Sequence, residues 1–191
     1  MGPRHPAFPE TDCGRCVEVM RDLAIQWRRT ETRDRNSLFT VMEEVCEDIE
    51  LRHAPQVRDD IREHCEEVST PEYMREKGVT AAVLAAEDLP MVSESPYITA
   101  GFLATRVCSE KAQACSLKEL DTLGRSMTEI PGRMFREGVK ATTEEGRLSI
   151  QKARTEHEAK LDGIRNKAEA EAAAAAAADA DKKDGPAHSE L

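Results

Sequence analysis

Cysteine is the residue type in this chain whose spacing indicates a chemical role. The six cysteines form a close pair at each end of the first 120 residues, with two single residues between the pairs: Cys13, Cys16, Cys46, Cys65, Cys108 and Cys115. A Cys-x-x-Cys motif at a helix N-terminus supports thiol–disulfide exchange, because the helix dipole and a nearby cation such as Arg15 stabilise the attacking thiolate. A thiol–disulfide oxidoreductase that uses Cys13 and Cys16 is therefore one hypothesis.

Structural disulfides are the preferred interpretation of these cysteines. A redox motif of this kind belongs in a fold of alternating strands and helices, and the sequence around Cys13 does not show that alternation. Zinc held by Cys13, Cys16, Cys108 and Cys115 is a third reading, but six residues separate the last two, whereas zinc pairs are usually roughly two to four residues apart. Spacing alone cannot choose among the possible pairings. We predict structural bonds, no metal site and no cofactor.

Hydrophobic periodicity predicts that helices position the cysteines. From Cys13 to about Thr30, apolar residues recur at helical spacing, which predicts an amphipathic helix with Cys16 on its buried stripe and Trp27 as a core anchor. We predict a second helix whose apolar positions run from Leu38 to Ile49, with Asn36 or Ser37 as the N-cap, and which stops near Ala54 because Pro55 follows.

A third helix is predicted to begin at Pro55, a residue favoured at the first helical position, and to reach about Val68. Cys46 and Cys65 then lie on facing apolar stripes of consecutive helices. Beyond it we expect a small-residue helix over 79–86, a loop over 88–96, and a helix from about Tyr97 into Cys108. No stretch alternates with a period of two, so the predicted fold class is all-α.

The character of the chain changes after residue 120. Pro131 and Gly132 are expected to break the chain, and residues 133–170 mix both charges with only a thin heptad-like apolar stripe. The alanine run 172–178 favours helix. The sequence therefore predicts four parts: a flexible lead (1–10), a compact domain (11–120), a charged helical extension (121–182) and a flexible tail (183–191). The extension is either a partner-binding arm or a salt-bridged spacer.

Composition limits the classes of function. The net charge of -10 opposes binding to nucleic acid or to anionic membranes through a basic face. No apolar run approaches the roughly 20 residues that a membrane-spanning helix requires. His53, His64 and His157 are scattered on helices and are expected to be solvated or locally satisfied. The sequence shows no serine triad, phosphate loop or paired carboxylates, so we predict that the protein is not an enzyme.

The last four residues, His188, Ser189, Glu190 and Leu191, form a variant of the signal that a retrieval receptor reads to return proteins to the endoplasmic reticulum. Six cysteines are compatible with the oxidising lumen of that compartment. The first nine residues have no apolar core and are not a secretory signal peptide. We therefore expect a lumenal protein whose signal peptide has been removed or is missing from this sequence.

Four segments together resemble the canopy family, saposin-like proteins of the endoplasmic reticulum. They are the opening stretch 12–23, the stretch 43–48 around Cys46, His64-Cys65-Glu66, and Val107-Cys108-Ser109 with Cys115. The resemblance covers about residues 11–120 and includes the retention signal. It implies a saposin-like domain with nested disulfides: Cys13 with Cys115, Cys16 with Cys108, and Cys46 with Cys65. The spacing departs from the family, because the Cys46–Cys65 segment is shorter than usual and the Cys65–Cys108 segment is longer.

The resemblance also implies a function. We expect a co-chaperone or folding factor of the endoplasmic reticulum lumen that binds immature secretory proteins or membrane receptors and meets the retrieval receptor through its C-terminus. A saposin-like lipid-binding protein is an alternative, since helices of this fold can separate and take lipid between their apolar faces. The oxidoreductase described above is the second alternative.

Overall fold

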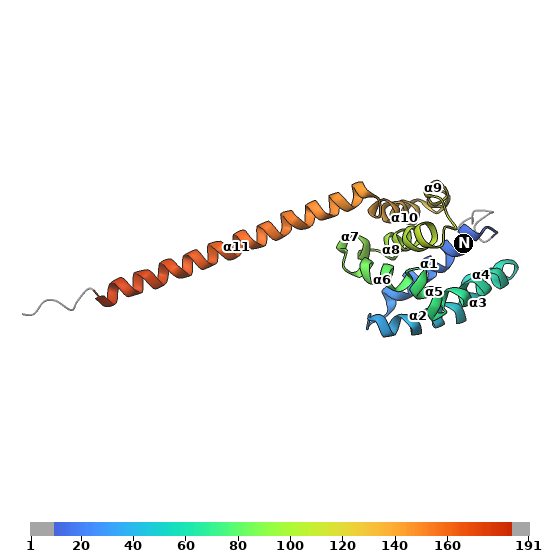
Figure 1. Cartoon of the computed structure of the whole chain (residues 1–191), viewed down its shortest axis with the longest axis horizontal. Helices are drawn as coiled ribbons and strands as arrows, with labels where there is room; N and C mark the ends of the chain where they lie inside the picture. The colour runs from blue at the N-terminus through green and yellow to red at the C-terminus, as the bar shows by residue number, and fades with distance from the viewer. Residues whose placement is uncertain (1–9, 185–191) are drawn as a thin grey trace, which may run out of the picture. The chain divides into compact units, whose positions relative to one another are not determined.

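The computed structural model describes the backbone of residues 10–184 and the side chains of residues 10–143 and 151–179. Within the described backbone every regular element is a helix and there is no strand. Three disulfides join these helices. The structure therefore confirms the all-α, disulfide-tied, saposin-like fold. The chain divides into two units, residues 1–147 and 148–191, and Figure 1 shows their helices.

Helix α1 (Asp12–Arg29) carries the predicted apolar stripe. Its N-cap is Thr11, whose hydroxyl oxygen accepts a hydrogen bond from the Gly14 N–H at 2.9 Å. Every residue of the stripe is buried, from Cys16 through Trp27. The Trp27 indole N–H donates to the Glu87 carboxylate at 2.7 Å, and this bond ties α1 to α6 (Val79–Glu87). Trp27 is thus the core anchor that the sequence predicts.

The next three helices include Cys46 and Cys65 and the segment between them. They are α2 (Arg35–Glu47), the single turn α3 (Ile49–Arg52) and α4 (Pro55–Val68). The N-cap of α2 is Asp34 rather than Asn36 or Ser37, because Asp34 and Ser37 form a reciprocal capping box. Helix α4 begins at Pro55 as predicted.

Helix α8 (Pro96–Leu103) packs against both α1 and α10. It follows α5 (Pro71–Glu76), α6 and α7 (Pro90–Ser93), a single helical turn inside the segment expected to be a loop. It continues without a break into the π-helix η1 (Ala104–Lys111), which carries Cys108. A π-helix is rare and concentrates at functional positions in proteins.

The compact unit continues beyond the predicted boundary at residue 120. Helices α9 (Leu117–Ser126) and α10 (Glu129–Ala141) pack against each other, α10 also packs on α8, and Leu120, Leu123 and Phe135 are buried. The predicted charged extension 121–182 is therefore wrong for its first part. The predicted break is also wrong, because Pro131 lies in the first turn of α10, where its missing N–H costs no helical hydrogen bond.

Glycines explain how α10 joins the core despite its few apolar residues. A Cβ atom on Gly101 of α8 would lie 1.9 Å from the Phe135 carbonyl oxygen, and one on Gly138 of α10 would lie 2.0 Å from the Ile98 carbonyl oxygen. A Cβ atom on Gly132 would lie 2.2 Å from the Gly124 carbonyl oxygen of α9. The backbones of these helices are in direct contact, so the close packing of α10 against α8 and α9 depends on these glycines.

Helix α11 (Glu144–Asp184) makes up the described part of the second unit, which begins at Leu148. All of its described side chains are exposed, including Leu161 and Ile164. Arg154 and Glu158 form one of its ion pairs, at 3.8 Å. The helix runs two residues past the predicted end at 182. The lead up to residue 9 and the last seven residues, with the predicted retention signal, lie outside the described residues.

Candidate functional site

The cysteines form three disulfides in a nested arrangement. Cys13 bonds Cys115 and Cys16 bonds Cys108, so the first two turns of α1 are joined to η1 and to the segment after it. Cys46 bonds Cys65 and joins α2 to α4. This is the pairing that the canopy resemblance implies, and it leaves no free cysteine among the six.

This pairing bears on the two chemical hypotheses for the cysteines, thiol–disulfide exchange and zinc binding. Cys13 and Cys16 are bonded to distant partners rather than to each other. Thiol exchange at this motif would first require reduction of the Cys13–Cys115 bond, and a four-sulfur zinc site would require both outer bonds to be reduced.

The end of η1 brings Cys115 back beside Cys108. The backbone N–H groups of Ala114 and Cys115 both donate to the Cys108 carbonyl oxygen, at 2.8 and 3.1 Å. Gln113 makes this return with φ of 54°, a left-handed conformation that non-glycine residues rarely adopt. The return places both cysteines opposite the first two turns of α1.

A buried polar cluster lies beside this framework and consists of Glu18, Asp22 and His53. The His53 Nε2 atom lies 2.7 Å from Asp22 Oδ2 and 4.0 Å from Glu18 Oε2. The three side chains are only 4%, 8% and 2% exposed, in that order. One ligand atom from each residue lies within 4.8 Å of the other two, which is close enough for a single metal ion to contact all three.

Two helices position this cluster. Glu18 and Asp22 are four residues apart on α1, so both point from one face of the helix. His53 is the C-cap of α3, where its N–H donates to the Ile49 carbonyl oxygen and its own carbonyl oxygen accepts from Arg58 Nε at 2.9 Å. Arg52 donates to the Gln26 side chain at 3.1 Å and attaches the same turn to α1.

The sequence interpretation missed this cluster, because it expected His53 to be solvated or locally satisfied. His53 is instead buried against a carboxylate 31 positions away. The sequence contained one indication of a buried polar site: Glu18 and Asp22 lie four residues apart, among the apolar residues of the α1 stripe. Nothing in the spacing of His53 indicated its partner.

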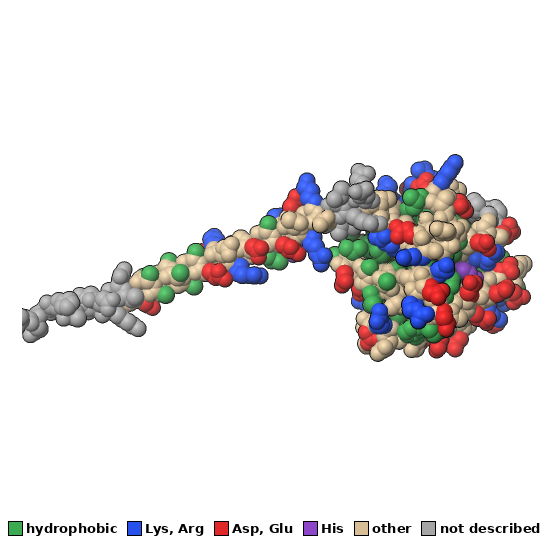
Figure 2. All heavy atoms as spheres, viewed as in Figure 1, with side chains coloured by type: hydrophobic (Ala, Val, Ile, Leu, Met, Phe, Trp, Pro, Cys, Tyr) green, Lys and Arg blue, Asp and Glu red, His purple; other side chains and the backbone are tan. Residues whose placement is uncertain are grey.

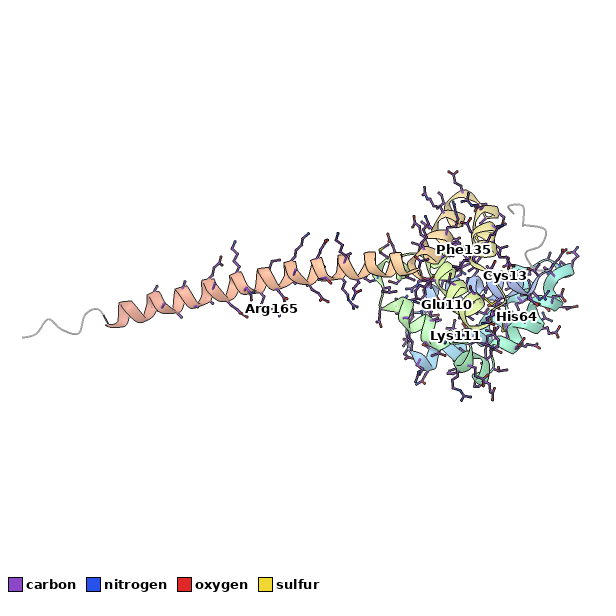
Figure 3. All side chains as sticks on the ribbon, turned by 45° about the horizontal axis from the view of Figure 1, so that its top comes forward. Cys13, His64, Glu110, Lys111, Phe135 and Arg165 are labelled. Carbon is purple, nitrogen blue, oxygen red and sulfur yellow. A yellow bond between two sulfur atoms is a disulfide. The ribbon has the colours of Figure 1, made fainter. Side chains whose placement is uncertain are left out.

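A polar cleft occupies the surface near the N-terminus of α1. Its first part is lined by Asp12, Arg15, Asp60, Glu63, His64 and Glu67. Its second part shares Asp12, His64 and Glu67 and extends along Tyr73, Lys77 and residues 112–114. Figure 3 labels His64, Lys111 and Cys13 on this compact unit.

His64 and Tyr73 are the titratable groups that this cleft perturbs. The rings meet edge to face with centroids 6.3 Å apart, and His64 Nδ1 lies 3.7 Å from Glu67 Oε2. Burial lowers the pKa of His64 below its usual value, against the opposing effect of the Glu67 carboxylate. Burial likewise raises the pKa of Tyr73 to about 12. His157, in contrast, is exposed on α11.

Large apolar side chains also reach the surface of the compact unit. Leu51 on α3 is 85% exposed, and Met91, Ile130 and Leu117 are each more than half exposed. Figure 2 shows hydrophobic side chains between charged ones on the visible face. Single exposed apolar residues are common, so these positions define a candidate contact surface rather than a formed pocket.

Comparison of the chain with protein-family models, with curated proteins and with solved structures finds no match in any of the three. The described helices include none with the length and apolar character needed to cross a membrane.

Proposed function

We propose that this protein is a folding factor of the endoplasmic reticulum lumen, related to the canopy proteins, that binds immature client proteins without catalysing a reaction. The observation that carries the proposal is the disulfide framework, which commits all six cysteines to structural bonds. Such bonds persist in the oxidising lumen. The His188–Leu191 signal supports the same compartment and a role for the retrieval receptor.

Exposed apolar side chains on a stable scaffold supply the contact with clients. An unfolded secretory protein exposes apolar segments, and Leu51, Met91 and Ile130 offer apolar area on three different helices. The disulfides stabilise the compact unit that carries those helices. The lipid-binding alternative needs the helices to separate, since apolar side chains such as Leu23, Val41 and Phe102 are buried.

Suppression of client aggregation tests this proposal. We expect the purified, oxidised chain to slow the aggregation of a reduced, denatured secretory protein, measured by light scattering. The triple variant Leu51→Ser, Met91→Ser, Ile130→Ser should lose most of this effect, because its contact area becomes polar.

The control variant Leu161→Ser, Ile164→Ser removes two exposed apolar residues from α11 and should act like the parent chain. Equal activity of the triple variant and the parent would contradict the proposed surface. Lipid that co-purifies in stoichiometric amount would favour the lipid-binding alternative. Reduction of Cys13 and Cys16 to free thiols at a modest reduction potential would favour the oxidoreductase.

A further inference from the structure

The buried cluster on α1 and α3 has the composition of a metal site. We propose that Glu18, Asp22 and His53 bind a divalent transition-metal ion, and that zinc is the ion they fit. This site is separate from the cysteines, and the inference does not depend on the proposed function.

The charge of the cluster supports the binding of a cation. Two carboxylates and one imidazole meet in this cluster, and the three side chains are more than nine-tenths buried. Burying carboxylate charge is costly unless it is compensated. A divalent cation bound between the three ligand atoms, which lie within 4.8 Å of one another, would interact favourably with both carboxylates.

The distances are compatible with one shared ion. Zinc binds imidazole nitrogen and carboxylate oxygen at about 2.0–2.2 Å, so two ligand atoms around one tetrahedral ion are roughly 3.3 Å apart. The distances from His53 Nε2 to Asp22 and to Glu18, 2.7 and 4.0 Å, lie on either side of this value. The shorter one is a hydrogen bond, whose proton the metal would displace. Small side-chain rotations are sufficient to form the site.

The ligands stand on elements that are already held in place. Glu18 and Asp22 follow Cys16, whose disulfide anchors α1, and the Cys46–Cys65 disulfide joins the helices on either side of α3. Arg58 fixes the His53 carbonyl oxygen at 2.9 Å. Rigid supporting contacts of this kind are what metal ligands require for tight binding.

The ligand set also selects among divalent ions. Magnesium and calcium prefer oxygen ligands alone, and a histidine disfavours both. Imidazole with carboxylates suits zinc and related transition metals. The three protein ligands leave a fourth tetrahedral position for water or another group.

Metal binding by the untagged, fully oxidised chain tests the site. The protein is stripped with a chelator and incubated with zinc chloride, or with magnesium chloride for comparison. After desalting, bound metal is measured by elemental analysis and the thermal midpoint by circular dichroism. We expect one zinc per chain and a midpoint that rises with zinc concentration, because the ion binds only the folded state. Magnesium should produce neither effect.

Glu18→Gln is the decisive variant, because it removes one charged ligand but leaves the hydrogen bond between His53 and Asp22. Its zinc affinity should fall roughly 10- to 100-fold or more, since even changes outside the ligand set cost that much. Glu63→Gln, at an exposed position in the polar cleft, is the control and should bind like the parent. Absence of bound zinc in the parent chain would overturn the proposal and leave the cluster as a structural hydrogen bond. Equal zinc binding by the parent and Glu18→Gln would also overturn it.

Discussion

At the scale of single residues, His64 shows how burial gives one side chain a pH dependence. Its ring lies between Tyr73 and Glu67 in a largely buried position, and burial lowers its pKa below the ordinary value of 6.5. The folded state therefore binds fewer protons than the unfolded state as the pH falls below 6.5. The stability that depends on a neutral His64 is present above this pH and is lost as the pH falls toward the folded pKa.

This shift leads to a prediction about pH and stability. The free energy of unfolding of the parent chain should decrease from pH 7.5 to pH 5.5, and His64→Gln should show a smaller decrease. Urea denaturation without reductant at both pH values measures the difference. His157→Gln, at an exposed position on α11, should retain the slope of the parent. The same slope in the parent and in His64→Gln would contradict the assignment.

At the scale of elements, the contact between α8 and α10 depends on the absence of side chains at two glycines. Gly101 and Gly138 allow the two backbones to touch, so Phe135 and Val139 can enter the core from a helix that is otherwise polar. Periodicity identifies helices with broad apolar faces, such as α1 and α4, but it does not reveal a helix that packs through glycine.

We therefore expect Gly101→Ala to destabilise the compact unit. The added methyl group would lie 1.9 Å from the Phe135 carbonyl oxygen, so the helices must move apart, at a cost of about 3 kcal/mol. Thermal and urea unfolding by circular dichroism measure this loss. The matched control is Gly163→Ala on α11, where a Cβ atom meets nothing within 4 Å. Gly163→Ala should stabilise helix α11 by about 1 kcal/mol, because alanine favours helix over glycine. Unchanged stability of Gly101→Ala would refute the close contact.

At the scale of the whole molecule, one unit contains all three disulfides and the described core, and the other is an exposed charged helix that leads toward the C-terminus. The Cys13–Cys115 bond closes a loop of 102 positions and restricts the unfolded chain by roughly 4–5 kcal/mol in the loop-entropy model. The nested Cys16–Cys108 bond adds less, because the further loop that it closes is short. The compact unit thus has its own sources of stability. The charged helix offers exposed ion pairs, which contribute little to stability.

This division predicts the outcome of two truncations. A chain that ends at Arg147 should melt at the temperature of the full compact unit, as measured by near-ultraviolet circular dichroism, because it keeps every disulfide. Expressed in a secretory pathway, it should also appear in the medium, as should a chain that ends at Ala187 and lacks only the retention signal. Retention of both chains inside the cell would contradict the proposed signal, and a large fall in melting temperature would contradict the independence of the compact unit.

The sequence by itself determined the helices that have a clear apolar face. Local spacing and backbone chemistry were sufficient to predict the Cys16–Trp27 stripe, the start of α4 at Pro55 and the small-residue helix α6. Apart from the cysteine pairs that the resemblance implied, tertiary structure decided which distant groups meet. The pairing of His53 with Asp22 and the approach of Gly101 to Phe135 depend on how the helices pack. The spacing of residues along the chain does not indicate this packing. The boundary at residue 120 was wrong for the same reason.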